Sequence, residues 1–107
     1  MDGEVPLPEL SSAPLTPGTL YLVATPIGNM EDITIRAIRT LRDCDLVAAE
    51  DTRHTGILLK RLRLAKRQVS THKFNEAKRA GDIISLLERG GTVALDVSYT
   101  HLRAHET

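Results

Sequence analysis

The stretch Thr19-Leu-Tyr-Leu-Val-Ala24 is a continuous apolar run bounded by Gly18 and Pro26. A short run of this kind, closed on both sides by turn residues, is typical of a strand that is buried on both faces of a parallel sheet. We therefore expect the first strand of the fold here. Shorter apolar segments follow along the chain at residues 45–50 and 92–95, and a weaker strand is expected at residues 68–71.

Between these segments the apolar residues change to a helical period. Ile33, Ala37, Ile38 and Leu41 lie on one helical face, with Asp32 placed to cap the first turn. A second helix is expected after Thr52. A third stripe consists of Ala80, Ile83, Ile84 and Leu87, follows a possible cap at Asn75, and is stopped by Gly90-Gly91. Alternating strands and helices predict an α/β fold with an open, mostly parallel sheet, flanking helices and right-handed crossovers.

The 107 residues allow one domain with one modest core. Residues 1–17 hold four prolines among acids and serines and are expected to form a disordered leader, with the domain over residues 18–95. The single cysteine, Cys44, cannot form an internal disulfide, and the chain shows neither a signal peptide nor a membrane span. We therefore expect a cytoplasmic protein. The formal net charge of zero decides nothing about a nucleic-acid partner.

Two polar loops follow strands of the expected sheet, and ligands of open α/β sheets bind at the carboxyl ends of the strands. In the first loop, Pro26 and Gly28 let the backbone turn sharply and approach a ligand. The same residues also suit an ordinary strand-to-helix turn, and spacing alone does not separate the two. We take this loop as the candidate cofactor site, formed by Thr25, Pro26, Gly28 and Asn29.

The second loop places four charged or ionisable residues in five positions. Its carboxylates are suited to accept a proton or to bind a ribose hydroxyl, and its arginine is suited to bind a phosphate. The candidate catalytic residues are Glu50, Asp51 and Arg53. In the alternative interpretation, Asp51 or Thr52 caps the next helix and Glu50 pairs with Arg53 at the surface. His54 alone is more often a solvated histidine than a catalyst.

Positive charge is concentrated in the middle of the chain, where it could follow a phosphate backbone or form a solvated helix face. The candidate RNA-binding residues are Arg53, Lys60, Arg61, Arg63, Lys66 and Arg67. Only 3% of the residues are aromatic, so a stacking platform for single-stranded RNA is poorly supported. Tyr21 and Phe74 are expected to be packing residues.

Two long motifs, residues 18–37 and 45–55, resemble the opening of ribosomal RNA 2'-O-ribose methyltransferases of the tetrapyrrole-methylase type. His72, Phe74, Asn75 and Glu76 match a His–Asn–Glu segment of that family, and residues 90–95 are similar to the start of its next strand. The resemblance implies methyl transfer from S-adenosylmethionine to the ribose 2'-hydroxyl of a cytidine in 16S rRNA of the small ribosomal subunit. It also implies two α/β domains with the cofactor between them, usually in a homodimer.

The resemblance ends after Leu95, where the family continues with a loop that helps to form the cofactor site and with a second domain. Residues 96–107 look instead like a non-native tail translated from a sequencing adapter, so we expect the residues after Asp96 to lie outside the sheet. His101 and His105 have the spacing of a zinc pair, but no third ligand is positioned for them, and no metal site is expected. The chain alone is therefore expected to be inactive.

Two other functions are compatible with the residues. A non-catalytic RNA-binding module would use the basic middle of the chain and would bind RNA without a cofactor. A nucleotide-binding α/β domain would use Gly28 and Glu50, although a lone glycine is a weak match to a dinucleotide-binding motif.

Overall fold

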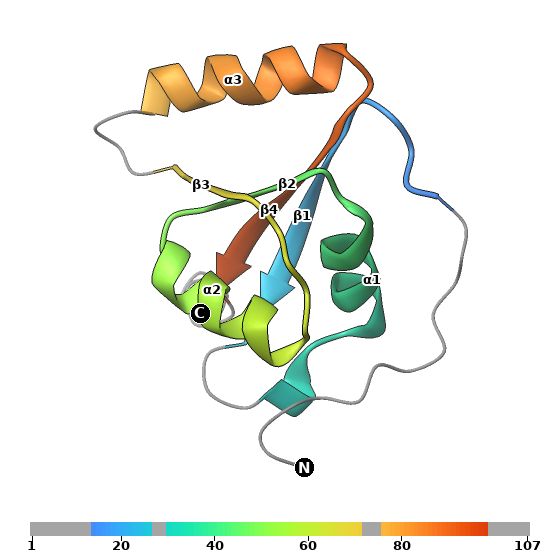
Figure 1. The fold of residues 1–107 in the computed structure, drawn as a ribbon, viewed down its shortest axis with the longest axis vertical. Coiled ribbons are helices and arrows are strands. Elements are labelled where there is room, and N and C mark those ends of the chain that lie inside the picture. The colour runs from blue at the N-terminus through green and yellow to red at the C-terminus, as the bar shows by residue number, and fades with distance from the viewer. Residues whose placement is uncertain (1–13, 27–29, 72–75, 99–107) are drawn as a thin grey trace, which may run out of the picture.

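The computed structural model describes residues 14–26, 30–71 and 76–98, which form one sheet with helices on both faces (Figure 1). The strands are β1 (Thr19–Thr25), β2 (Leu46–Ala49), β3 (Gln68–Ser70) and β4 (Thr92–Ser98). All their pairings are parallel, in the order β1-β4-β2-β3. The helices are α1 (Ile35–Asp43), α2 (Thr52–Arg61) and α3 (Glu76–Glu88), and a single 3-10 turn, η1 (Met30–Asp32), precedes α1. The expected α/β fold with a parallel sheet is confirmed.

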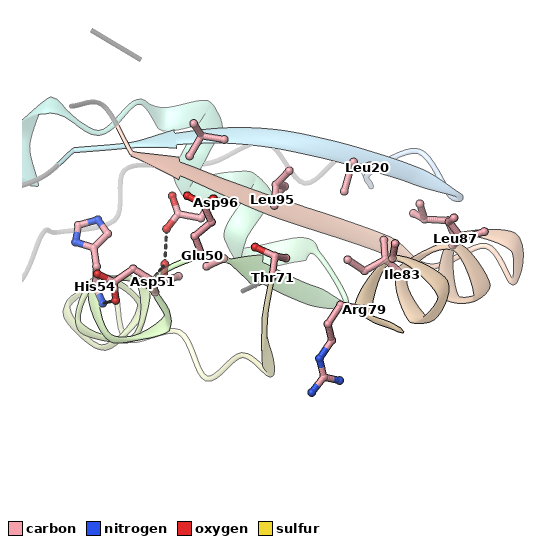
Figure 2. Close-up of a pocket in the computed structure, with 15 residues that line it drawn as sticks. Leu20, Glu50, Asp51, His54, Thr71, Arg79, Ile83, Leu87, Leu95 and Asp96 are labelled. Carbon is pink, nitrogen blue, oxygen red and sulfur yellow. Dashed lines mark hydrogen bonds between the residues drawn. The ribbon is translucent and has the colours of Figure 1, made fainter. Parts of the chain in front are cut away.

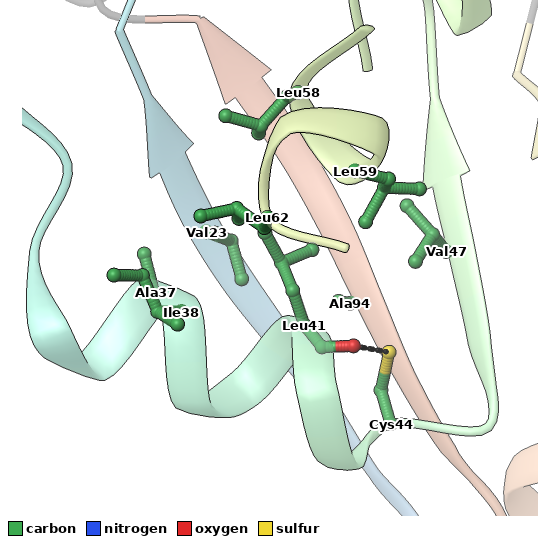
Figure 3. Close-up of a cluster of buried hydrophobic side chains, with 10 residues drawn as sticks. All are labelled: Val23, Ala37, Ile38, Leu41, Cys44, Val47, Leu58, Leu59, Leu62 and Ala94. Carbon is green, nitrogen blue, oxygen red and sulfur yellow. Dashed lines mark hydrogen bonds between the residues drawn. The ribbon is translucent and has the colours of Figure 1, made fainter. Parts of the chain in front are cut away.

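The main hydrophobic core lies between one face of the sheet and the pair α1 and α2. Figure 3 shows Leu41 of α1 and Leu62, which follows α2, meeting over Val23 of β1. In the described part of the chain the opposite face of the sheet carries only α3, whose Ile83, Leu86 and Leu87 pack on a second, smaller cluster. The core is therefore uneven, with two helices on one face and one on the other. Within the described residues, none of the helices has the length and apolar character needed to cross a membrane.

The cap of helix α1 lies two residues later than the sequence predicts. Thr34, not Asp32, is its cap: the Thr34 side-chain oxygen accepts a hydrogen bond from the Ala37 backbone N–H at 3.0 Å. Asp32 lies in η1. A threonine directly before the first helical residue satisfies an N–H that the helix itself leaves unpaired, which a residue in the preceding turn cannot reach.

Helix α3 ends as the two glycines predict. Gly90 has φ 88, a left-handed conformation that glycine adopts without strain. The N–H of Gly90 donates to the Leu87 carbonyl, and the N–H of Gly91 donates to the Leu86 carbonyl, both at 3.0 Å. These bonds satisfy carbonyls of the last turn and direct the chain into β4. The expected cap at Asn75 falls outside the described residues.

Strand β4 continues further than expected. Val97 pairs with Ala24, and Ser98 pairs with Thr25. The expectation that residues after Asp96 lie outside the sheet is therefore wrong for these two residues. The reason is geometric, because β1 extends to Thr25 and a parallel neighbour in this register finds backbone partners as far as Ser98.

Candidate cofactor and substrate site

The polar loops meet at the carboxyl edge of the sheet. Strand β2 ends at Ala49, which is in register with Asp96 of β4, and β1 ends at Thr25, which is in register with Ser98. Because all four strands run in the same direction, the residues that follow β1 and β2 emerge at one edge. This edge is where both loops were expected to form a site.

A buried carboxylate stands at the centre of this edge. Thr25 donates its hydroxyl to Asp96 Oδ1 at 2.5 Å, and Thr55 donates its hydroxyl to Asp96 Oδ2. Both threonines are fully buried, and Asp96 is 9% exposed. Charge-assisted hydrogen bonds of this kind compensate part of the cost of burying a carboxylate. Asp96 therefore connects the end of β1 to the first turn of α2.

The site residues predicted from the sequence do not include Asp96 and Thr55. Asp96 was assigned to the start of a foreign tail, although a carboxylate directly after the apolar residues 92–95 was visible as a signal. Thr55 directly follows the charged residues of the second loop and is not among the residues predicted for the site. Their contact joins positions that are 41 residues apart, and nothing local in the sequence indicates it.

Asp51 is the cap of α2, as the alternative interpretation of the second loop predicted. Its Oδ1 accepts hydrogen bonds from the backbone N–H of Arg53 at 3.0 Å and of His54 at 3.2 Å. These bonds satisfy two of the donors that the first turn leaves open. The carboxylate of Asp51 is thus engaged in holding the helix, whereas Glu50 is an exposed residue in the bend before it.

His54 connects the two loops. Its Nε2 lies 3.4 Å from Thr25 Oγ1. The Thr25 hydroxyl donates to Asp96, so its oxygen is available as an acceptor for the tautomer of His54 that carries its proton on Nε2. The chain of contacts runs from His54 through Thr25 to Asp96 and fixes the imidazole beside the cavity described next.

A cavity of about 570 Å³ opens beside these residues. Figure 2 shows that Glu50, Asp51, His54 and Asp96 gather at one end, and that Leu20, Ile83 and Leu87 lie at the other. Arg79 and Thr71 lie along the side, and the Arg79 guanidinium is 3.5 Å from Asp82. A cavity with a polar end and an apolar end suits a ligand that combines a flat apolar part with hydroxyls or a positive charge.

S-adenosylmethionine is a ligand of this kind, since it has an adenine ring, ribose hydroxyls and a sulfonium cation. The carboxylates of Glu50 and Asp96 at the polar end suit the positive or hydroxyl-bearing parts, and the leucine and isoleucine side chains suit the ring. The residues predicted for the cofactor are placed differently. Thr25 and Pro26 are buried below the edge and do not line the cavity, while Gly28 and Asn29 fall outside the described residues.

The candidate RNA-binding residues differ in whether their side chains are exposed or packed against the rest of the chain. Most of them have exposed side chains on α2 and in the turn that leads to β3, namely Arg53, Lys60, Arg61, Arg63 and Arg67. Lys66 is half-buried and donates from Nζ to the Cys44 carbonyl at 2.6 Å. Cys44 is the C-cap of α1, so Lys66 stabilises the end of that helix. Burial raises the pKa of the Cys44 thiol, against a smaller opposite effect of the Lys66 charge.

Polar loops at the carboxyl edge of a parallel sheet are typical of ligand-binding α/β domains. A model of the family described as Tetrapyrrole (Corrin/Porphyrin) Methylases matches residues 19–98, and the chain belongs to this family. The match includes β4 as far as its last residue.

The particular proteins that the chain resembles are named Ribosomal RNA small subunit methyltransferase I. The relative from Streptococcus pyogenes is 51% identical over 79 residues, which cover 74% of this chain and 28% of the relative. The relative from Halalkalibacterium halodurans is 54% identical over 78 residues, and that from Thermotoga maritima is 51% identical over 78 residues. These cover 73% of this chain, and 27% and 35% of the two relatives. The chain thus spans about a third or less of the length of these relatives, and the resemblance seen in the sequence is confirmed.

Proposed function

We propose that these residues form part of an enzyme that methylates the ribose 2'-hydroxyl of a cytidine in 16S rRNA, with S-adenosylmethionine as the methyl donor. The observation that carries the proposal is the identity of about one half to relatives named for methylation of small-subunit ribosomal RNA. The polar cavity at the carboxyl edge of the sheet supports it. We further propose that the whole enzyme is a cytoplasmic homodimer and that the present chain is inactive alone.

Bound S-adenosylmethionine would supply a methyl group that its sulfonium already activates for transfer. The protein then has to place the ribose hydroxyl in line and accept its proton. Glu50 is the group we assign to the proton, because it is an exposed carboxylate at the polar end of the cavity. Asp51 acts as a positioning residue through the cap of α2, which orients Arg53 and His54.

The exposed cations that follow Glu50 suit the phosphates around the target nucleotide. Arg53 lies in the first turn of α2, two residues after its cap, and Lys60 and Arg61 occupy the last turn. Phosphate contacts of this kind fix the register of a nucleic acid without reading its sequence. In this proposal the RNA backbone lies along α2 beside the cavity, and Arg53 is the cation nearest to the reacting ribose.

The test joins residues 1–98 to the part of the Streptococcus pyogenes relative that follows the matched segment. Labelled S-adenosylmethionine and small ribosomal subunits without the modification are the substrates. We expect the label in 16S rRNA on the 2'-oxygen of a ribose. The phosphodiester bond on the 3' side of that nucleotide should then resist alkaline cleavage, because the 2'-hydroxyl is methylated. Glu50→Gln is expected to lower kcat about 100-fold or more, and Glu88→Gln, on the distant end of α3, serves as the control. Label on a base, or full activity of Glu50→Gln, would contradict the proposal.

The two alternatives give different results in the same preparation. A non-catalytic RNA-binding module would bind 16S rRNA equally well with and without S-adenosylmethionine and would transfer no label. A nucleotide-binding domain would bind ATP or NAD through the present chain alone. Three carboxylates line the cavity, from Glu50, Asp51 and Asp96, and they disfavour the phosphates that such a domain would hold.

A further inference from the structure

A second, smaller cavity lies between α3 and the β3 side of the sheet. It has a volume of about 350 Å³, and three arginines line it, Arg67, Arg79 and Arg89. Apolar side chains of β2, β3 and α3 and the hydroxyl-bearing Ser85 also line it. We call this cavity the arginine groove. None of the catalytic or cofactor-binding residues predicted from the sequence lines it.

The three arginines come from two segments of the chain. Arg79, Leu86 and Arg89 are separated by seven and three positions, so they lie along one side of the helix. Arg89 directly follows α3, but its N–H still donates to the Ser85 carbonyl at 3.2 Å, which continues the helical turn. Arg67 directly precedes β3. One arginine therefore reaches the groove from the sheet and two reach it from the helix.

The positive charge of the groove is only partly balanced. Two carboxylates line it, and both already contact donors of the chain. Asp45 Oδ2 accepts a hydrogen bond from a backbone N–H of β4 at 2.9 Å, and Asp82 lies 3.5 Å from the Arg79 guanidinium. Arg67 and Arg89 are exposed, and neither has an ion pair in the part of the chain that the structure describes. Two guanidinium groups are therefore available to an anion.

Arg79 connects the groove to the larger cavity, because it lines both. Figure 2 shows its guanidinium pointing away from Glu50 and Asp96, at the polar end of that cavity. The contact with Asp82 is long, and Arg79 Nε is buried without a hydrogen-bond acceptor among the described residues. A buried donor without an acceptor is costly, so the Arg79 side chain gains from an additional acceptor in the groove.

The groove also continues the basic surface of α2. Arg67 belongs to the exposed cations that follow α2, and it lines the groove as well. Helices α2 and α3 pack on opposite faces of the sheet, and β3 is an edge strand of the described sheet. The cations thus extend from α2 around the β3 edge to α3. Guanidinium groups bind phosphates with paired hydrogen bonds, and a continuous row of cations can follow a nucleic-acid backbone.

We propose that the arginine groove binds a phosphate of the ribosomal RNA backbone through Arg67, Arg79 and Arg89. This inference deepens the proposed function, on which the choice of RNA as the ligand rests. The RNA then contacts α2 on one face of the sheet and α3 on the other, with the β3 edge between them. A phosphate contact of this kind fixes the position of the RNA beside the larger cavity and reads no base.

Binding of protein-free 16S rRNA to the present chain tests the proposal, because the residues that line the groove all lie within residues 45–89. Arg89→Gln removes one charge of the groove, and Arg36→Gln, on the exposed side of α1, is the matched control. We expect Arg89→Gln to weaken binding about threefold in 0.2 M salt relative to its effect in 0.05 M salt, and to lower the slope of log K against log salt by about 1. Arg89→Lys should retain the slope, since the charge remains. Arg36→Gln should change neither value.

Modification of arginine side chains by phenylglyoxal provides a second measurement on the unmutated chain. We expect 16S rRNA to protect Arg67 and Arg89 from the reagent and to leave the modification rate of Arg36 unchanged. Unprotected groove arginines, or an Arg89→Gln variant that binds with the affinity and salt dependence of the unmutated chain, would overturn the proposal. Protection by intact small ribosomal subunits but not by protein-free 16S rRNA would overturn it in favour of a ribosomal protein as the ligand.

The results also distinguish a failure of this proposal from a failure of the proposed function. Methyl transfer by the extended chain described above, with Arg67 and Arg89 unprotected by 16S rRNA, would overturn the groove proposal and leave the function in place. Protected groove arginines and no methyl transfer by the extended chain would support the groove as an RNA-binding surface and overturn the enzymatic function.

Discussion

Thr25 and Asp96 lie 71 residues apart in the sequence and are joined by a 2.5 Å hydrogen bond between the Thr25 hydroxyl and the Asp96 carboxylate. Thr55 binds the other carboxylate oxygen. The end of β1, the end of β4 and the first turn of α2 are therefore held at one buried group. The position of both polar loops depends on this group, because Thr25 precedes the first loop and Thr55 follows the second.

Replacing Asp96 by alanine is expected to lower the free energy of unfolding by about 1–3 kcal/mol, because two buried hydroxyls lose their acceptor. The triple change Thr25→Val, Thr55→Val and Asp96→Val removes the two hydroxyls and the carboxylate together, while His54 Nε2 and the Asp51 carbonyl each lose one contact. It is expected to recover most of the loss, since replacing both sides of a buried hydrogen bond by apolar groups can be nearly neutral. Urea unfolding followed by circular dichroism measures both. A triple variant less stable than Asp96→Ala would show that the carboxylate has another role.

Substitutions of the two acidic residues of the second loop are expected to have different effects on the free energy of unfolding. Asp51→Ala should cost about 0.5–2 kcal/mol of stability through the lost cap of α2, and Asp51→Ser should retain most of it. Glu50→Ala should leave the free energy of unfolding within about 0.5 kcal/mol of the parent chain, since Glu50 is exposed. Thermal and urea unfolding check these values. The reverse order of effects would transfer the capping role to Glu50.

The basic residues are likewise expected to divide into two groups. In the chain extended to the full length of a relative, Arg53→Gln and Arg61→Gln should weaken binding to 16S rRNA. Each should lower the slope of log K against log salt by about 1, with little change in stability. Lys66→Gln should instead destabilise the fold, because the bond to the Cys44 carbonyl at the end of α1 is lost. Filter binding at several salt concentrations and urea unfolding separate the groups. Lost stability with unchanged affinity for Arg53→Gln would reverse the assignment.

The present chain is expected to transfer no methyl group and to bind S-adenosylmethionine weakly. Its cavity is open at the apolar end, where Leu20 and Ile84 are exposed, and small ligands gain most of their affinity in pockets that enclose them. The loss of fixed geometry also removes an advantage of roughly 7–11 kcal/mol that positioning gives to a reaction between two bound groups. Calorimetric titration and a radiolabelled transfer assay on unmodified small subunits test both statements. Stoichiometric binding with a Kd below about 1 µM, or turnover above background, would show that these residues suffice for cofactor binding or for methyl transfer.

The sequence predicted the elements better than their arrangement. The apolar run that opens at Thr19 predicts a strand correctly, but the expected burial on both faces is wrong in the described part of the chain, because Leu20 and Leu22 of β1 are exposed. The glycines at 90 and 91 identify a helix end, because a left-handed turn restricts the residue type. The insertion of β4 between β1 and β2 has no local signal, since it depends on pairings between distant residues. For the same reason Asp96 was missed, whereas the cap at Asp51 was among the alternatives that its spacing allowed.

The place of β4 in the sheet also determines when the sheet can be completed during synthesis. Until residues 92–98 leave the ribosome, β2 can pair with β3, but β1 lacks β4, its neighbour in the described sheet. The first strand of the described sheet must therefore wait for the fourth. Over that interval its leucines remain available to other nascent chains, and a pause in translation before Thr92 would prolong this exposure.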